Sequence, residues 1–154
     1  METLKINNGS LCYDKEATIA AYKNIVAIKN YKCACQICRN YYAAAENFPT
    51  EIKSFFKTLG VDLALPCEVY DFGVPPKDGE MKTDGWYHLV GTLSNRDDTE
   101  QFAIADGYKI SFSNRTDMLP EGFPEPVVQM YIDFTIPWVL DENYGDFIPV
   151  ERKK

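Results

Sequence analysis

The spacing of hydrophobic and polar positions changes along the chain near Pro66. Before this residue, apolar side chains recur three or four positions apart, and after it they mostly alternate with polar ones. Helical spacing is typical of a helix with one buried stripe, and alternation is typical of a strand with one buried face. The pattern predicts an α+β fold, with helices in the first half of the chain and most strands in the second.

Two consecutive helices are predicted, at about residues 36–48 and 51–59. Pro49 ends the first apolar run, because proline lacks the N–H that a helix interior needs. Thr50 is the predicted N-cap of the second helix, and Gly60 is expected in the left-handed conformation that ends many helices. We expect both apolar stripes to pack on one face of a sheet.

The N-terminal segment contains a hairpin signal at Asn8-Gly9, which lies between two apolar stretches. Both residue types tolerate a positive φ, so the pair predicts a tight turn. The assignment of the residues that follow remains open. Residues 15–23 are compatible with a helix capped by Asp14, whereas Ile25, Val26 and Ile28 are typical of a strand.

The second half of the chain predicts an antiparallel, mostly meandering sheet with one wet face. Asp106-Gly107 indicates another tight turn between two strands, and residues 74–85 are expected to form a polar loop. The predicted strands span residues 67–72, 86–93, 101–105, 108–113 and 127–136.

Length, charge and hydropathy indicate the domain organisation, the kind of partner and the cellular location. The 154 residues fit a single globular domain over 1–150, with a tail at 151–154 that is expected to fray. A net charge of -7 makes nucleic acid and anionic membranes poor partners and favours a basic protein partner. The N-terminus lacks a basic segment leading into an apolar one, and no stretch is apolar over a membrane-spanning length, which predicts a cytoplasmic protein.

Candidate chemistry is concentrated in Cys33, Cys35 and Cys38, a C-x-C-x-x-C cluster at the start of the first predicted helix. Cysteines at this spacing can direct their sulfurs at one centre, and the positive end of a helix stabilises a thiolate. Three alternatives remain open: thiols that only pack, a zinc site, or a redox pair at Cys35 and Cys38. Zinc would need a fourth ligand from far along the chain, and the candidates are Cys67, Cys12 and His88, with Cys67 completing the predicted site.

His88 is the only histidine, and a histidine-based catalytic site would have to use it. The sequence contains no nucleophile elbow, glycine-rich phosphate loop, H-E-x-x-H motif or EF-hand spacing. We therefore expect His88 to be a hydrogen-bonded strand residue. The absence of these motifs favours a non-enzymatic protein over an enzyme.

Four short motifs carry a resemblance: C-Q-I-C-R-N-Y at 35–41, L-G-V-D at 59–62, G-W-Y-H at 85–88 and L-P-E-G-F-P at 119–124. Together they resemble a group of small uncharacterised bacterial proteins with a C-x-x-C-R-N motif. The resemblance covers most of the chain after Lys32. It implies a bacterial cytoplasmic protein and brings no established activity.

Two functional hypotheses follow. The first is a non-enzymatic acidic binding or accessory protein of the bacterial cytoplasm, because aromatic residues such as Trp86 and Trp138 stand among acids. The alternative is a zinc-binding or thiol-redox protein that uses Cys33, Cys35 and Cys38.

Overall fold

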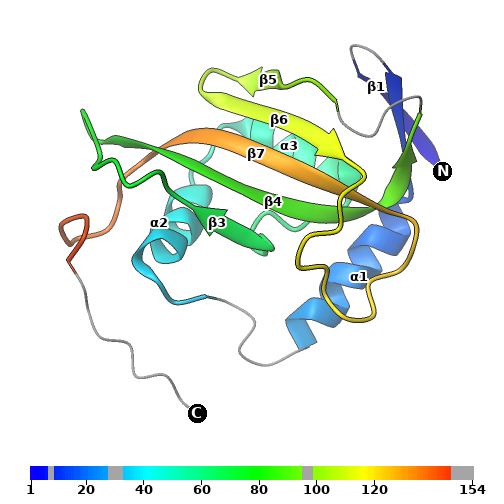
Figure 1. Ribbon diagram of the computed structural model, residues 1–154, viewed down its shortest axis with the longest axis horizontal. Helices are drawn as coiled ribbons and strands as arrows, with labels where there is room; N and C mark the ends of the chain where they lie inside the picture. The colour runs from blue at the N-terminus through cyan, green and yellow to red at the C-terminus, as the bar shows by residue number, and fades with distance from the viewer. Residues whose placement is uncertain (7–8, 28–32, 95–98, 147–154) are drawn as a thin grey trace.

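A computed structural model describes residues 1–6, 9–27, 33–94 and 99–146, and it confirms the α+β class. Within these residues, one antiparallel sheet of seven strands has three helices on one side (Figure 1). The strands are β1 (Glu2–Ile6), β2 (Gly9–Tyr13), β3 (Glu68–Tyr70), β4 (Glu80–Leu93), β5 (Phe102–Ala105), β6 (Tyr108–Ser113) and β7 (Val127–Pro137). The predicted tail at 151–154 lies outside the described residues.

The strand order is β1-β2-β4-β7-β6-β5, and β3 pairs with β4 beside β2. The long pair β4 and β7 forms the middle of the sheet, in register from Glu80↔Pro137 to Val90↔Val127. The order departs from a simple meander because β2 pairs with β4 and because β7 lies between β4 and β6. Consecutive strands are neighbours in the pairs β1–β2 and β3–β4 and in the run β5–β6–β7.

The helices are α1 (Lys15–Ala27), α2 (Gln36–Ala45) and α3 (Thr50–Leu59). The predicted capping role of Asp14 is confirmed, since its Oδ1 accepts from the Ala17 amide at 3.0 Å. The predicted strand character is wrong for Ile25 and Val26, which belong to α1, and Ile28 lies outside the described residues. No helix in the described part of the chain is long and apolar enough to cross a membrane.

The two consecutive helices are confirmed with small changes at their ends. The first ends at Ala45 instead of residue 48, with Glu46 as its C-cap. Phe48 directly precedes Pro49 and is therefore disfavoured in the helical conformation. The second begins at Thr50 itself, with Pro49 at the N-cap position and no side-chain cap. Gly60 has a φ of 79°, as predicted, and its N–H donates to carbonyls of the last helical turn.

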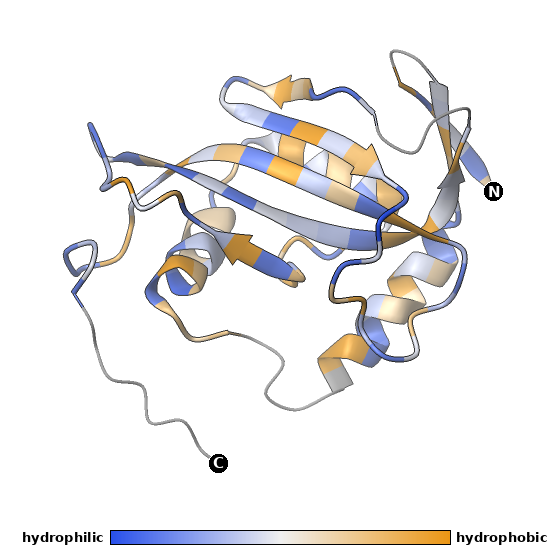
Figure 2. Ribbon diagram, viewed as in Figure 1, coloured by the Kyte–Doolittle hydropathy of each residue, from blue (hydrophilic) through white to orange (hydrophobic). Residues whose placement is uncertain are grey.

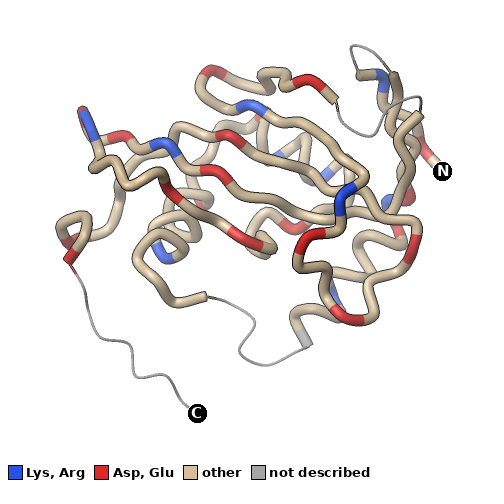
Figure 3. The backbone as a smooth tube through the Cα atoms, viewed as in Figure 1, with Lys and Arg blue, Asp and Glu red and all other residues tan. Residues whose placement is uncertain are grey.

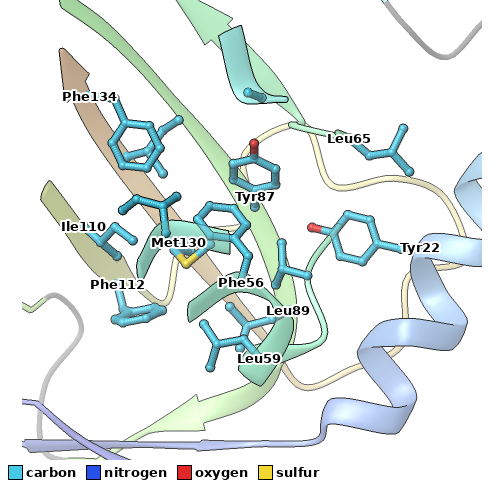
Figure 4. Packing of buried hydrophobic residues seen from close by; sticks show 14 of the residues in the cluster. Tyr22, Phe56, Leu59, Leu65, Tyr87, Leu89, Ile110, Phe112, Met130 and Phe134 are labelled. Atoms are coloured by element: carbon cyan, nitrogen blue, oxygen red, sulfur yellow. The ribbon is translucent and has the colours of Figure 1, made fainter. Parts of the chain in front are cut away.

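The core lies between the sheet and the helices. Phe56 and Leu59 of α3 pack against fully buried residues of the central strands (Figure 4). Aromatic edges contribute, with the rings of Phe56 and Tyr87 4.9 Å apart and nearly perpendicular. The labelled sheet residues of this core are Tyr87, Leu89, Ile110, Phe112, Met130 and Phe134. Figure 2 shows the alternation of hydropathy along these strands.

Strand β4 begins earlier than the sequence predicts, because residues 80–85 extend it through the expected loop. Met81 and Thr83 are buried there, whereas Lys82 is exposed. A Cβ on Gly85 would lie 2.3 Å from the carbonyl oxygen of Glu68, so glycine is required where β3 approaches. Its role is close packing of two strands rather than a turn.

The N-terminal hairpin is confirmed as β1 and β2, but its turn is displaced by one residue. Gly9 pairs with Ile6 in the ladder instead of occupying the centre of the turn. Residues 7 and 8, which connect the strands, lie outside the described residues.

Candidate metal centre

Three cysteines converge at the start of α2. The sulfurs of Cys33, Cys35 and Cys38 all lie within 4.8 Å of one another, which is close enough to hold a metal ion. Zinc–sulfur bonds of about 2.3 Å place thiolates roughly 3.8 Å apart in a tetrahedron. Small rotations of exposed side chains cover this difference, so the three thiols form a nearly assembled ligand set.

The local backbone brings these sulfurs together. Cys35 is the N-cap of α2, and its Sγ accepts a hydrogen bond from the Cys38 amide at 3.5 Å. The Sγ of Cys33 accepts from the Cys35 amide at 3.4 Å. Sulfur thus takes the place that an oxygen side chain occupies in most N-caps. N–H donors aimed at sulfur favour the ionised form that binds metals.

The three thiols differ in their environments. Cys33 and Cys35 are exposed, whereas Cys38 is buried against the core. Burial opposes ionisation of Cys33, but hydrogen bonds from the Cys35 amide and the other two thiols outweigh it and lower the Cys33 pKa. Burial, followed by the thiol of Cys35, raises the pKa of Cys38. The Cys33 thiol is therefore easier to ionise than the buried Cys38 thiol, and a bound cation would stabilise the thiolate form of each ligand.

Residues of the C-x-x-C-R-N motif tie this turn to the segment after β7. The Arg39 guanidinium donates to Glu142 at 2.8 Å and, through Nε, to the carbonyl of Ala34 at 3.0 Å. Ala34 lies between two of the cysteines, so Arg39 links the cysteine turn directly to a distant segment. Gln36 adds bonds of 2.9 Å to Glu142 and to the Asn143 carbonyl.

Asn40 completes the connection from a buried position. Its Nδ2 donates to the Pro137 carbonyl at 3.2 Å, and its Oδ1 accepts from the Val139 amide at 2.8 Å. The Arg and Asn of the motif therefore position the cysteine turn instead of binding an ion themselves. The sequence showed the motif but not its partners, which lie about a hundred residues away.

The three candidates for a fourth ligand lie elsewhere. In the part of the chain that the structure describes, no further Cys, His, Asp or Glu joins the group of Cys33, Cys35 and Cys38. The Cys67 thiol instead donates to the Met118 carbonyl at 3.2 Å, and burial raises its pKa to about 11. Cys12 lies in β2, and it too stands outside the group.

His88 is a buried strand residue, as predicted. Its Nε2 lies 3.3 Å from Oε1 of Gln129, which pairs with it across β4 and β7. Burial lowers the His88 pKa, although Gln129 and Asp117 oppose the shift. Burial and the hydrogen bond to Gln129 are together sufficient to account for His88 as a neutral structural residue of β4.

The chain was compared with protein-family models, with curated proteins and with solved structures, and none of the three comparisons finds a match. The case for function therefore depends on the geometry of the chain itself.

Proposed function

We propose that this protein binds a thiophilic metal ion, with zinc the first candidate, through Cys33, Cys35 and Cys38. The observation that carries the proposal is the convergence of three sulfurs within 4.8 Å at the start of a helix. Thiolates prefer zinc, Cu(I) and iron–sulfur iron over hard cations such as magnesium and calcium. The three-cysteine set thus favours a soft or borderline ion.

The fourth coordination position is proposed to be open to solvent. Cys33 and Cys35 are exposed, and no fourth protein ligand from the described residues joins the group. Zinc with three protein ligands usually takes water or an exogenous ligand at the fourth position. We therefore replace the expected Cys67 ligand by water in this proposal.

Thiol redox activity is a second candidate function, and one specific observation favours it. Cys35 is exposed at the helix N-terminus, and Cys38 lies three residues later, buried in the first turn. An attacking thiol and a buried resolving thiol have this arrangement in disulfide oxidoreductases. Metal loading and disulfide formation compete for the same sulfurs, so one experiment distinguishes them.

The experiment is elemental analysis of the protein purified under reducing, chelator-free conditions. We expect about one zinc per chain, lost in Cys33→Ser, Cys35→Ser and Cys38→Ser. Cys12→Ser and Cys67→Ser are the matched controls and should keep the metal. A metal-free protein that forms a Cys35–Cys38 disulfide with an oxidised dithiol reagent would support the redox function instead, and a protein with neither property would refute both.

The cellular setting is part of the proposal. All five cysteines are free thiols in the structure, which suits a reducing compartment. We propose the bacterial cytoplasm that the resemblance implies, and we propose a binding protein rather than an enzyme.

A further inference from the structure

The sheet face opposite the helices carries a compact group of acids and aromatic rings. Tyr70, Asp84, Trp86, Tyr131 and Asp133 lie next to one another on β3, β4 and β7, and we name these five residues the acidic aromatic patch. All five are partly exposed. No helix in the described part of the chain covers this face, which looks toward the viewer in Figure 1.

Two carboxylates form the centre of the patch. Asp84 and Asp133 are directly paired across β4 and β7. Figure 3 shows acidic positions along the central strands of the sheet. Oδ1 of Asp84 is buried, and no donor from the described residues reaches it. Two adjacent ionised carboxylates repel each other, so the pair favours a shared proton or bound cations. Lys82 supplies one cation to Asp133, at 3.6 Å, and forms no salt bridge with Asp84.

Aromatic rings flank the carboxylates, with Tyr70 directly opposite Asp84 and with Trp86 and Tyr131 paired on the adjacent row of the sheet. The Trp86 ring lies 5.7 Å from that of Tyr131 and 6.3 Å from that of Tyr70. Its Nε1 donates to the Asp117 carbonyl at 3.0 Å, and this hydrogen bond fixes the orientation of the indole ring. Rigid aromatic anchors of this kind are enriched at protein interfaces.

Lys82 shows how a cation fits this surface. Its Nζ lies 5.1 Å from the centroid of the Phe72 ring and 3.6 Å from Oδ1 of Asp133. The ammonium group therefore contacts an aromatic face and a carboxylate together. Asp84 with Tyr70 and Trp86 offers the same combination, and no cation from the described residues is paired with it.

Exposed apolar side chains extend the surface beyond β3. Phe72 is 50% exposed and Val74 is 63% exposed, and Phe72 packs against Tyr70 with ring centroids 5.7 Å apart. A partner seated on the patch would also cover these residues. Apolar positions beside a charged centre are typical of protein-binding surfaces rather than of simple ion sites.

We propose that the acidic aromatic patch binds an arginine side chain from a basic segment of a partner protein. A planar guanidinium can donate to both carboxylates and stack on the Trp86 indole, which a spherical cation cannot do. The overall charge of -7 would attract such a segment from a distance. This surface is separate from the thiols of α2 and does not depend on metal binding.

The test is titration of the protein with a penta-arginine peptide, followed by NMR. The sequence has two tryptophans, so the two indole N–H signals report separately on the patch and on Trp138. We expect saturable shifts of the Trp86 signal and little change at Trp138. A penta-lysine peptide of equal charge should bind several-fold more weakly, because ammonium groups do not stack or bind in a bidentate way.

Variants with equal charge separate specific binding from general attraction. Asp84→Asn with Asp133→Asn should weaken peptide binding at least tenfold, whereas Glu16→Gln with Glu51→Gln should change it less than twofold. The control acids are exposed on α1 and α3, away from the patch. Far-ultraviolet circular dichroism verifies that both double variants fold.

Three outcomes would overturn the proposal. The first is equal weakening in the two double variants, which would show non-specific charge attraction. The second is peptide shifts without saturation. The third is saturation of the Trp86 signal by magnesium alone at similar concentration, which would make the patch a metal-ion site. None of these outcomes bears on the cysteine cluster.

Discussion

The guanidinium of Arg39 lies 2.8 Å from the Glu142 carboxylate and also binds the carbonyl of Ala34 between two cysteines. Residues about a hundred positions apart therefore hold the cysteine turn in place. Groups that orient metal ligands without touching the ion often affect metal affinity strongly. The Arg39–Glu142 pair has this position in the candidate centre.

Glu142→Gln removes the charge of this pair while keeping an acceptor for Gln36. We expect the dissociation constant for zinc to rise about tenfold, because the cysteine turn loses its fixed orientation. Competition with a chromophoric chelator measures the constant. Asp141→Asn is the control, since Asp141 is a neighbouring exposed acid, and an equal effect in both variants would show that only overall charge matters.

Two buried tyrosines should differ in their importance for stability. The hydroxyls of Tyr41 and Tyr87 are 2.6 Å apart, and Tyr87 also donates to the Leu63 carbonyl at 2.7 Å. Tyr87→Phe removes the hydroxyl that pairs with both the Tyr41 hydroxyl and the Leu63 carbonyl. The loss should lower the free energy of unfolding by about 2 kcal/mol. Tyr41→Phe removes one bond and should cost about 1 kcal/mol. Urea unfolding measures both values, and the reverse order would contradict this hydrogen-bond arrangement.

Gly85→Ala should loosen β3 selectively. Its Cβ would meet the Glu68 carbonyl at 2.3 Å, so β3 must move away from β4. The Cys67 amide, which donates to the Trp86 carbonyl at 2.8 Å, should then exchange hydrogen faster. Gly107→Ala is the control, because it strains a turn between β5 and β6 and should leave this amide protected. Unchanged exchange in Gly85→Ala would contradict the close packing.

The Asp84–Asp133 pair predicts a pH-dependent stability. Burial, followed by the charge of Asp133, raises the pKa of Asp84 to about 7. Between roughly pH 4 and pH 7 the folded state holds a proton that the unfolded state has lost, so this group's contribution to stability falls as pH rises.

Asp84→Asn removes this loss, because an amide does not ionise. Relative to the unmodified protein, the variant should gain about 1 kcal/mol more at pH 8 than at pH 5, after discounting for solvent screening. Urea unfolding at the two pH values measures the difference. An identical shift at both pH values would show that Asp84 does not titrate in this range.

The sequence predicted elements wherever local spacing determined them. The stripe of α3, with Gly60 ending it, and the alternation of β7 follow from residues close together in the chain. The start of β4 was missed because Lys82, Asp84 and Gly85 have the composition of a loop. Only the approach of β3 explains why glycine stands there.

Long-range pairing and the partners of the candidate site were outside the reach of local patterns. The insertion of β7 between β4 and β6 depends on contacts between distant segments, and the same is true of Glu142 at the cysteine turn. The convergence of Cys33, Cys35 and Cys38 was predictable, because their spacing across a helix start brings the sulfurs together. Cys67 was chosen for its residue type alone, and the structure directs its thiol to Met118.

X-ray absorption spectroscopy of the zinc-loaded protein tests the central claim most directly, because it counts the atoms bound to the metal. We expect three sulfurs at about 2.3 Å and one oxygen or nitrogen at about 2.0 Å. Cys67→Ser should leave the spectrum unchanged. Four sulfurs, or a spectrum without sulfur, would contradict a centre built from Cys33, Cys35 and Cys38 with one open position.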